Sequence, residues 1–66
     1  LVEALSKREF EILGLLAQRH GNKEIAEQLF ISLQTVKRHV ANIFGKLGVN
    51  RRADAVAKAD ALGLLK

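Results

Sequence analysis

The chain contains no cysteine, proline, methionine, tryptophan or tyrosine in its 66 residues. Without cysteine, neither a disulfide framework nor a cysteine-based zinc site is available. The two histidines, His20 and His39, lie nineteen positions apart and form no recognisable metal site, so we expect no metal and no cofactor. The fold must rest on its apolar core, although a chain of this length buries only roughly 60% of the surface that its unfolded form exposes.

Long apolar runs are also absent. No stretch approaches the roughly 20 residues needed to span a bilayer, and no signal peptide is visible. We therefore expect no membrane partner and a cytoplasmic location. The length fits one domain, residues 1–66. Because the chain begins with Leu1 rather than Met, we interpret it as a piece of a longer protein whose remainder holds any sensing or catalytic part.

Acidic residues are missing from one long stretch, which runs from Gln28 to Ala53. Five basic residues lie within it: Lys37, Arg38, Lys46, Arg51 and Arg52. Residues 1–27 carry a net charge of −1, and residues 54–66 are balanced. A concentrated basic surface on a small domain favours a polyanionic partner, most often nucleic acid. From charge alone, a solvated charged face is an equal alternative.

The residues that are present favour helices. Leu and Ala are abundant, and apolar residues recur at helical spacing rather than alternating. We expect an all-α fold, a four-helix domain containing a helix-turn-helix. The predicted helices cover about residues 7–18, 22–29, 33–47 and 51–62.

Capping residues set these boundaries. The predicted N-caps are Ser6 (with Glu9 as a capping box), Asn22, Ser32 and Asn50. The predicted ends are Gly21, with His20 as a cap, and Gly48, while Gly63-Leu64-Leu65 should fold back as a hydrophobic C-cap. In the turn before the third helix, we expect Phe30 and Ile31 to contact the core.

The second and third predicted helices are separated by about three residues. This is the outline of a helix-turn-helix, whose second helix lies in the DNA major groove, and Ala26 is small where the two helices would cross. In the helix over 33–47, one narrow apolar face points inward: Val36, Val40, Ile43 and Leu47. His39 lies at the edge of that face, where we expect its hydrogen bonds to be satisfied.

The opposite arc of the same helix consists of Gln34, Lys37, Arg38, Ala41, Asn42 and Gly45. Arg and Lys read guanine, Asn and Gln read adenine, and a small residue contacts a thymine methyl. This arc therefore carries the residue types that read base edges. The residues that we predict to contact the DNA backbone are Asn22, Lys23, Thr35, Asn42, Lys46 and Arg51. For Arg52 we favour simple solvation.

Patterns for other functions are weak. The chain has no Cys or Tyr nucleophile and no Gly-rich phosphate loop, and Ser6 and Ser32 are better explained as caps. We expect no enzymatic activity and no small-molecule ligand in this fragment. A protein-interaction module is the main alternative, but such a face would show exposed Leu, Phe or Met anchors on the helix over 33–47.

The helix predicted over 51–62 carries small apolar residues around much of its circumference: Ala53, Ala55, Val56, Ala57, Ala59 and Ala61. High helix propensity in a short terminal helix is one interpretation. The other is a helix that packs on the core with one side and on a second copy with the other. The sequence leaves both open.

Several motifs together resemble the LuxR/GerE-type helix-turn-helix domain. They are Leu5-Ser6-Lys7-Arg8-Glu9, Asn22-Lys23-Glu24-Ile25-Ala26-Glu27, Ile31-Ser32, Thr35-Val36-Lys37, His39, Lys46-Leu47-Gly48-Val49, Arg52, Ala55-Val56 and Leu62-Gly63-Leu64. The resemblance covers nearly the whole chain, and the chain departs from the family pattern at Arg38, Ala41 and Gly45.

The resemblance implies the C-terminal DNA-binding domain of a bacterial transcription regulator. It implies base contacts at Lys37, Arg38 and Ala41, and it makes the last helix the usual dimer contact, to which we assign Val56 and Ala59. The expected partners are double-stranded DNA and a second copy of the chain. For the parent protein, the large ATP-binding subgroup and response regulators with a receiver domain both remain open.

Overall fold

A computed structural model of the chain describes residues 5–65, and four α-helices make up its regular structure. They are α1 (Lys7–Ala17), α2 (Asn22–Leu29), α3 (Leu33–Leu47) and α4 (Arg52–Ala61). No strand occurs in residues 5–65, and no helix there is long and apolar enough to cross a membrane. The all-α, four-helix prediction is confirmed, and α2 with α3 forms the helix-turn-helix.

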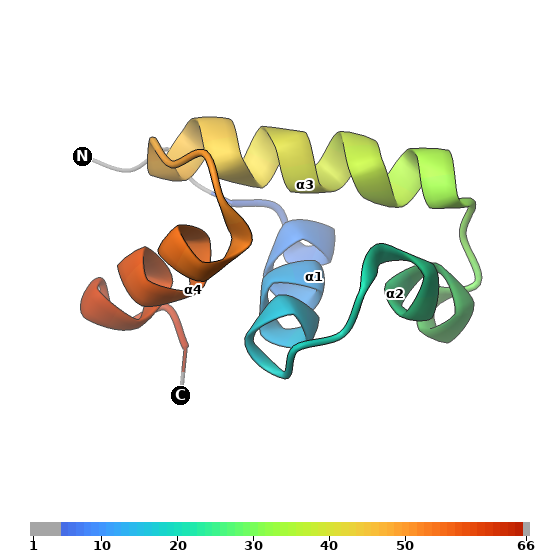
Figure 1. Cartoon of the computed structure of the whole chain (residues 1–66), viewed down its shortest axis with the longest axis horizontal. Helices are drawn as coiled ribbons and strands as arrows, with labels where there is room; N and C mark the ends of the chain where they lie inside the picture. The colour runs from blue at the N-terminus through green and yellow to red at the C-terminus, as the bar shows by residue number, and fades with distance from the viewer. Residues whose placement is uncertain (1–4, 66) are drawn as a thin grey trace.

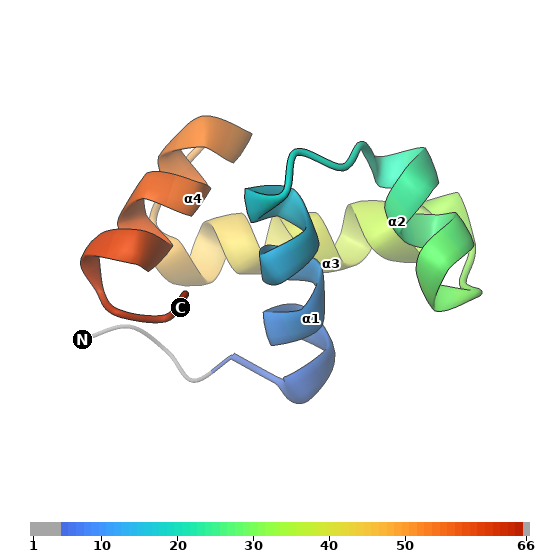
Figure 2. The same ribbon diagram turned by 90° about the horizontal axis from the view of Figure 1, so that it is seen from below.

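The longest helix, α3, lies across the other three. Figure 1 shows α4, α1 and α2 in that order along one side of α3, and Figure 2 shows from below that α1 lies between α4 and α2. α3 contacts each of these helices, and α1 also contacts α4. Because all three supporting helices lie on one side, the opposite side of α3 is left uncovered by the described chain.

The core contains residues from every helix: Ile12, Leu13 and Leu16 of α1, Ile25 and Ala26 of α2, Val36, Val40, Ile43 and Leu47 of α3, and Ala55 and Ala59 of α4. The predicted inward face of α3 is thus confirmed at all four positions. Ala26 is buried where α2 packs on α3, as its small size predicted. On α4 only alanine side chains are buried, so its backbone lies close to the core.

Two of the four predicted helix starts are confirmed. The Ser6 hydroxyl accepts a hydrogen bond from the Glu9 N–H at 3.1 Å, and the Glu9 carboxylate accepts one from the Ser6 N–H at 2.8 Å, which completes the capping box. The Ser32 hydroxyl accepts from the Thr35 N–H at 3.1 Å at the start of α3.

The other two predicted caps are wrong by one residue. Asn22 is the first residue of α2 and not its cap; the N-cap is Gly21, whose N–H donates to the Glu24 carboxylate at 2.9 Å. Asn50 is also not a cap, because Arg51 takes the extended N-cap conformation before α4. Neither Gly21 nor Arg51 accepts a side-chain hydrogen bond from its helix, so neither N-cap is of the Ser, Thr, Asp or Asn type that marks a helix start in the sequence.

All four helices end in the same way. A residue with positive φ follows each helix, namely Arg19, Phe30, Gly48 and Gly63, with φ of 68°, 57°, 70° and 73°. The next residue then bonds back by its N–H to a carbonyl five positions earlier, the Schellman pattern. The predicted end at Gly48 and the turn at Gly63 are confirmed, with the Leu64 N–H bonded to the Ala59 carbonyl at 2.9 Å.

The predicted end of α1 at Gly21 is wrong, since the left-handed residue is Arg19 and α1 stops at Ala17. His20 completes this turn through its main-chain N–H, which donates to the Leu15 carbonyl at 3.1 Å. At the end of α2, Ile31 packs against the core as predicted, but the Phe30 side chain is 95% exposed. The prediction that Phe30 contacts the core is therefore wrong; its left-handed backbone turns the ring outward.

Candidate nucleic-acid interface

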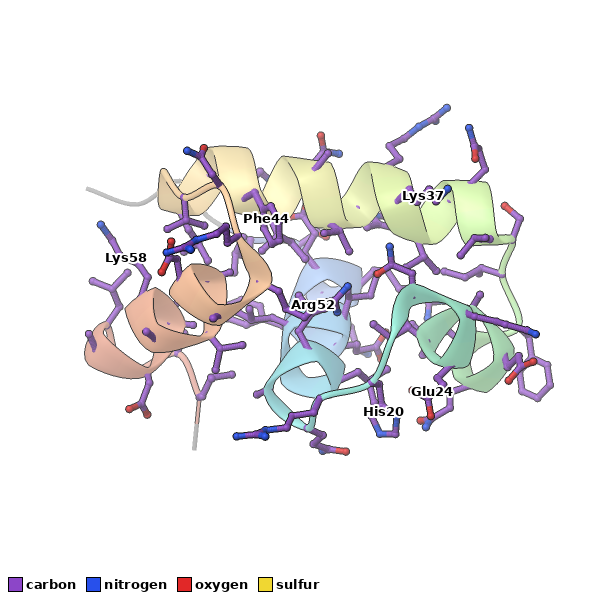
Figure 3. The ribbon with its side chains drawn as sticks, viewed as in Figure 1. His20, Glu24, Lys37, Phe44, Arg52 and Lys58 are labelled. Carbon is purple, nitrogen blue, oxygen red and sulfur yellow. The ribbon has the colours of Figure 1, made fainter. Side chains whose placement is uncertain are left out.

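The uncovered side of α3 carries the polar and small residues that the sequence placed there. This outer arc consists of Gln34, Lys37, Arg38, Ala41, Asn42 and Gly45, and all six are exposed. Ser32 fixes the start of the helix, and the buried residues Val36 and Ile43 fix its rotation, so the arc has a defined orientation. Figure 3 shows Lys37 on the half of α3 that lies beside α2.

Three basic residues of the helix-turn-helix have no partner inside the described chain. Lys37 and Arg38 on α3 and Lys23 on α2 are exposed, and residues 5–65 supply no ion pair or hydrogen bond to their side chains. Long cationic side chains without a competing carboxylate remain available to an anionic partner. The charges of these three residues of the helix-turn-helix are therefore accessible from outside.

The N-terminus of α3 holds Thr35 in a small hydrogen-bonded unit. Its hydroxyl lies 2.8 Å from the Ser32 hydroxyl, and its N–H donates to the same oxygen. Thr35 is half-buried, while Asn42, about two turns further on, is exposed. Helix N-termini carry unpaired N–H groups and the positive end of the dipole, which favours anions at this end of α3.

Asn22 and Lys23 open α2, and Arg52 reaches them from α4. The Arg52 guanidinium donates to the Asn22 side-chain oxygen at 2.9 Å and to the His20 carbonyl at 3.0 Å. Figure 3 shows Arg52 between α4 and the turn that carries His20. Arg52 is half-buried, so the prediction of simple solvation is wrong. No local pattern signals this contact, because its partners lie 30 and 32 positions away.

Lys46 also contacts the chain itself. Its Nζ lies 2.7 Å from Oε1 of Glu9, whose side chain is buried at the start of α1. The hydrogen bond from Lys46 lowers the pKa of Glu9, with help from the Ser6 N–H and against the opposing effect of burial. The Lys46 side chain is 26% exposed, so a phosphate at this position competes with Glu9 for the same ammonium group.

Arg51 forms a weaker contact. Its Nε lies 3.2 Å from the Asp54 carboxylate one turn into α4, and both side chains are exposed enough for water to screen the pair. Exposed ion pairs of this kind contribute about 0–1 kcal/mol, so Arg51 can exchange Asp54 for another anion at small cost.

The two histidines do not form a site. The Nδ1 atom of His39 is buried and has no hydrogen-bond partner among the described residues, so the expected satisfied hydrogen bond is not found. His20 lies 3.8 Å from the Glu24 carboxylate. The Gly21 N–H is the main reason that the pKa of Glu24 is lowered. No group of acidic and histidine residues in the described part of the chain could hold a metal ion.

The assigned dimer residues of α4 differ in exposure. Ala59 is fully buried in the core, so its assignment to a contact with a second copy is wrong. Val56 is half-buried and lines an open hollow of about 700 Å³ between the end of α1 and α4. Ala53 and Ala57 line the same hollow and are exposed. The outward side of α4 therefore includes Ala53, Val56 and Ala57 and excludes Ala59.

A short turn joins α2 to α3, and α3 packs on the other three helices while its polar outer arc is exposed. This arrangement defines a helix-turn-helix domain of the DNA-binding class. The model of the family described as "Bacterial regulatory proteins, luxR family" matches residues 3–59. The chain belongs to this family and is a LuxR-type helix-turn-helix DNA-binding domain of transcription regulators.

Individual relatives agree with this family. The chain is 53% identical over 57 residues to the transcriptional regulatory protein LiaR of Bacillus subtilis, covering 86% of the chain and 27% of LiaR. It is 53% identical over 55 residues to the oxygen regulatory protein NreC of Staphylococcus aureus, covering 83% of the chain and 25% of NreC. The chain therefore spans about a quarter of the length of these curated relatives.

Two solved structures have the same fold. The crystal structure of the response regulator ChrA, from a haem-sensing two-component system, superposes with a TM-score of 0.91 and 47% identity, over 94% of this chain and 31% of that one. The structure of the transcription factor GerE gives a TM-score of 0.86 and 42% identity, over 94% of this chain and 92% of that one. The resemblance inferred from the sequence motifs is confirmed.

Proposed function

We propose that this domain binds double-stranded DNA sequence-specifically, with α3 in the major groove. The observation that carries the proposal is the outer arc of α3, which is exposed along the helix and includes two cations without a partner in the described chain. A major groove about 12 Å wide accepts one α-helix, and an uncovered helix supported from behind has the required shape.

Base reading falls to three residues near the middle of this arc. Arg38 and Lys37 supply the donors that pair with guanine O6 and N7, and the methyl group of Ala41 suits a thymine methyl. All three are exposed, and the small Ala41 lies between larger neighbours, so the helix can approach the base edges closely. Removal of one base-reading side chain should relax specificity at one position.

Backbone contacts are proposed for six residues: Asn22, Lys23, Thr35, Asn42, Lys46 and Arg51. Asn22, Lys23 and Thr35 lie at the N-termini of α2 and α3, where N–H groups and helix dipoles favour phosphate. Asn42 is exposed on the outer arc. Lys46 and Arg51 each have to leave or share a carboxylate partner, so we expect their contacts with phosphate to contribute less than that of Lys23.

We propose that two copies bind two half-sites through α4. Val56 remains in the proposed contact, now with the exposed Ala53 and Ala57, while Ala59 is excluded by its burial. Small side chains on this surface let a second helix approach closely. The isolated fragment should be a weak dimer or a monomer, and the rest of the parent protein should control dimerisation or access to α3. The likeness to the response regulator ChrA supports a receiver-domain parent over the ATP-binding subgroup.

Fluorescence anisotropy of a labelled random duplex, titrated at several salt concentrations, tests the proposal. Binding should weaken linearly on a log–log plot of affinity against salt, as counterion release requires. Lys23→Ala should reduce the slope by about one, whereas Lys58→Ala, which removes an exposed lysine from α4, should leave it unchanged. The absence of binding at low salt and high protein concentration would contradict the proposal.

A protein-binding role is the second candidate, and one observation favours it. Phe30 exposes 95% of its side chain at the turn between α2 and α3, and an exposed aromatic ring is a common anchor in protein interfaces. The outer arc itself offers no such anchor. If the duplex titration failed, the Phe30 surface would be the first place to look for a partner.

A further inference from the structure

The structure joins the start of α2 to α4 through a single side chain. Arg52, the first residue of α4, donates from Nη2 to the Asn22 side-chain oxygen at 2.9 Å and from Nη1 to the His20 carbonyl at 3.0 Å. Both contacts are partly buried, so water competes with them less than with an exposed pair. One guanidinium therefore holds the last residues before α2 and the first residue of α2 in one geometry.

The chemistry of the two groups decides which way the Asn22 amide faces. A guanidinium has donors only, whereas an amide has an oxygen that accepts and an NH₂ group that donates. The Asn22 oxygen must therefore face Arg52, and its Nδ2 group points away from it. No residue within 5–65 accepts a hydrogen bond from this Nδ2 group.

The Nδ2 group stands where the proposed DNA backbone would be contacted. It lies on the first residue of α2, beside the exposed Lys23 and the N–H groups of the helix start. All of these groups are donors, and a phosphate only accepts. If the amide were free to rotate, its oxygen would face the phosphate in one of the two orientations and oppose binding.

We propose that Arg52 is a positioning residue that fixes the Asn22 amide with its NH₂ group toward a DNA phosphate. The inference rests on the proposed DNA binding and adds to it a residue that does not itself touch DNA. It also gives α4 a second role. This helix is proposed to form the dimer contact, and through Arg52 it also holds the N-terminus of α2, where we propose that a DNA phosphate binds.

The main test removes the side-chain NH₂ donor of Asn22 and keeps the side-chain oxygen that accepts from Arg52. Asn22→Asp keeps an oxygen for Arg52 but removes the NH₂ group, so the contact with Arg52 stays or strengthens. Gln28→Glu is the matched control, because it makes the same amide-to-carboxylate change on an exposed residue of α2. The probe is the labelled random duplex at one low salt concentration, with thermal melting of each variant measured in parallel.

We expect Asn22→Asp to melt at or above the temperature of the unaltered chain and to bind the duplex about tenfold more weakly than Gln28→Glu does. Equal weakening by both variants would overturn the proposal, because the loss would then follow from added negative charge alone. If the unaltered chain failed to bind, the proposed function would fail instead, so the two failures are distinguishable.

A second test reads the amide directly. In ¹⁵N–¹H spectra, the Asn22 side-chain NH₂ signals should shift when the duplex is added, while those of the exposed Gln18, after the end of α1, should not. Arg52→Lys keeps the charge but cannot hold both acceptors in the same fork geometry, so the Asn22 shift should shrink and affinity should fall several-fold. Arg8→Lys on α1 is the control that should change neither.

A merely structural role for Arg52 predicts a different pattern. The melting temperature of Arg52→Lys would fall, but the Asn22 amide would shift with DNA as it does in the unaltered chain. That result, obtained with folded Arg52→Lys protein, would overturn the proposal. If Arg52→Lys did not fold, Asn22→Asp would still decide the question, because it leaves Arg52 in place.

Discussion

Two regions of the molecule use the same kind of residue for different purposes. On the outer arc of α3, Lys37 and Arg38 are exposed and pair with nothing in residues 5–65. On the other sides of the bundle, Lys46 pairs with the buried Glu9 of α1, and Arg52 joins α4 to the start of α2. These four residues come from one uninterrupted basic block of the sequence, yet only half of them face outward unpaired.

The difference shows why net charge is an incomplete guide to an interface. A basic block predicts a positive surface only to the extent that its members have no carboxylate or carbonyl partner in the fold. Here Lys46 and Arg52 hold helices in place, whereas Lys37 and Arg38 are exposed on the helix that the packing leaves uncovered. The two groups should therefore respond differently to substitution.

The sharpest test compares two lysines of the same helix. Lys46→Ala leaves the Glu9 carboxylate buried without its cation, and breaking a buried pair in this way should lower the free energy of unfolding by about 3 kcal/mol. Lys37→Ala removes an exposed, unpaired side chain and should change it by less than about 0.5 kcal/mol. Urea denaturation measures both. Equal losses of stability would remove the distinction between the two groups.

Arg38 tests the outward group by its effect on binding. Arg38→Ala should cost about 2 kcal/mol of discrimination between a selected target sequence and a variant altered at one base pair, with no loss of stability. Arg8→Ala on α1 is the control, since it removes an exposed arginine on a helix outside the helix-turn-helix. Anisotropy titrations with the two duplexes measure the discrimination. An unchanged sequence preference would show that Arg38 does not read a base.

The acid dependence of stability tests the inward group. The hydrogen bond from Lys46 lowers the pKa of Glu9 below its ordinary value of 4.5, so the ionised carboxylate stabilises the folded state. This stabilisation is complete above the unfolded pKa and is lost as the pH falls through the folded one. Glu9→Gln keeps a residue suited to the capping box and should cost about 2 kcal/mol at neutral pH.

The difference between the unaltered chain and Glu9→Gln should then shrink as the pH falls below the ordinary pKa of 4.5 and through the lowered pKa of Glu9. Melting curves from neutral to acid pH measure it. Glu11→Gln is the control, because Glu11 is exposed and its one ion pair within residues 5–65 is with Arg8. A difference that stayed constant with pH would show that the charge of Glu9 is not what Lys46 recognises.

The exposed and the paired basic residues also differ in how well the sequence alone predicts their positions. The helices, the inward face of α3 and the caps at Ser6 and Ser32 follow from periodicity and local hydrogen-bonding types, and the structure confirms them. The outer arc follows from the same periodicity, because a fixed inward face determines the opposite one. Structural features that depend on residues within one or two helical turns of each other can therefore be predicted from the sequence.

Contacts between residues far apart in the sequence cannot be predicted from such local patterns. Glu9 and Lys46 are 37 positions apart, so the sequence alone suggested a capping residue and a phosphate contact rather than a pair. Arg52 appeared to be a solvated residue for the same reason. The end of α2 at Leu29 was predicted, but the left-handed turn at Arg19 and the exposure of Phe30 escaped prediction, because both residues take a conformation that normally favours glycine. In both turns the next residue bonds back by its N–H to a carbonyl five positions earlier, so the Schellman geometry forms without a glycine to mark it.

Substitution of Gly45 should have the smallest effect on stability, and it tests whether the fold requires a glycine at this position of the outer arc. Gly45 lies in the last turns of α3, is exposed, and a Cβ placed on it would meet nothing within 4 Å. Gly45→Ala should therefore raise the free energy of unfolding by about 1 kcal/mol through helix propensity alone. Gly14 on α1 has equally open space, so Gly14→Ala is a matched control with a similar expected gain.

The two glycine variants should differ in binding. If the C-terminal half of α3 approaches the DNA closely, Gly45→Ala should bind the duplex more weakly in spite of its greater stability, while Gly14→Ala should bind it as the unaltered chain does. Melting curves and anisotropy titrations on the same samples separate the two effects. Equal binding by both variants would place the end of α3 away from the DNA and confine base reading to the part around Lys37 and Arg38.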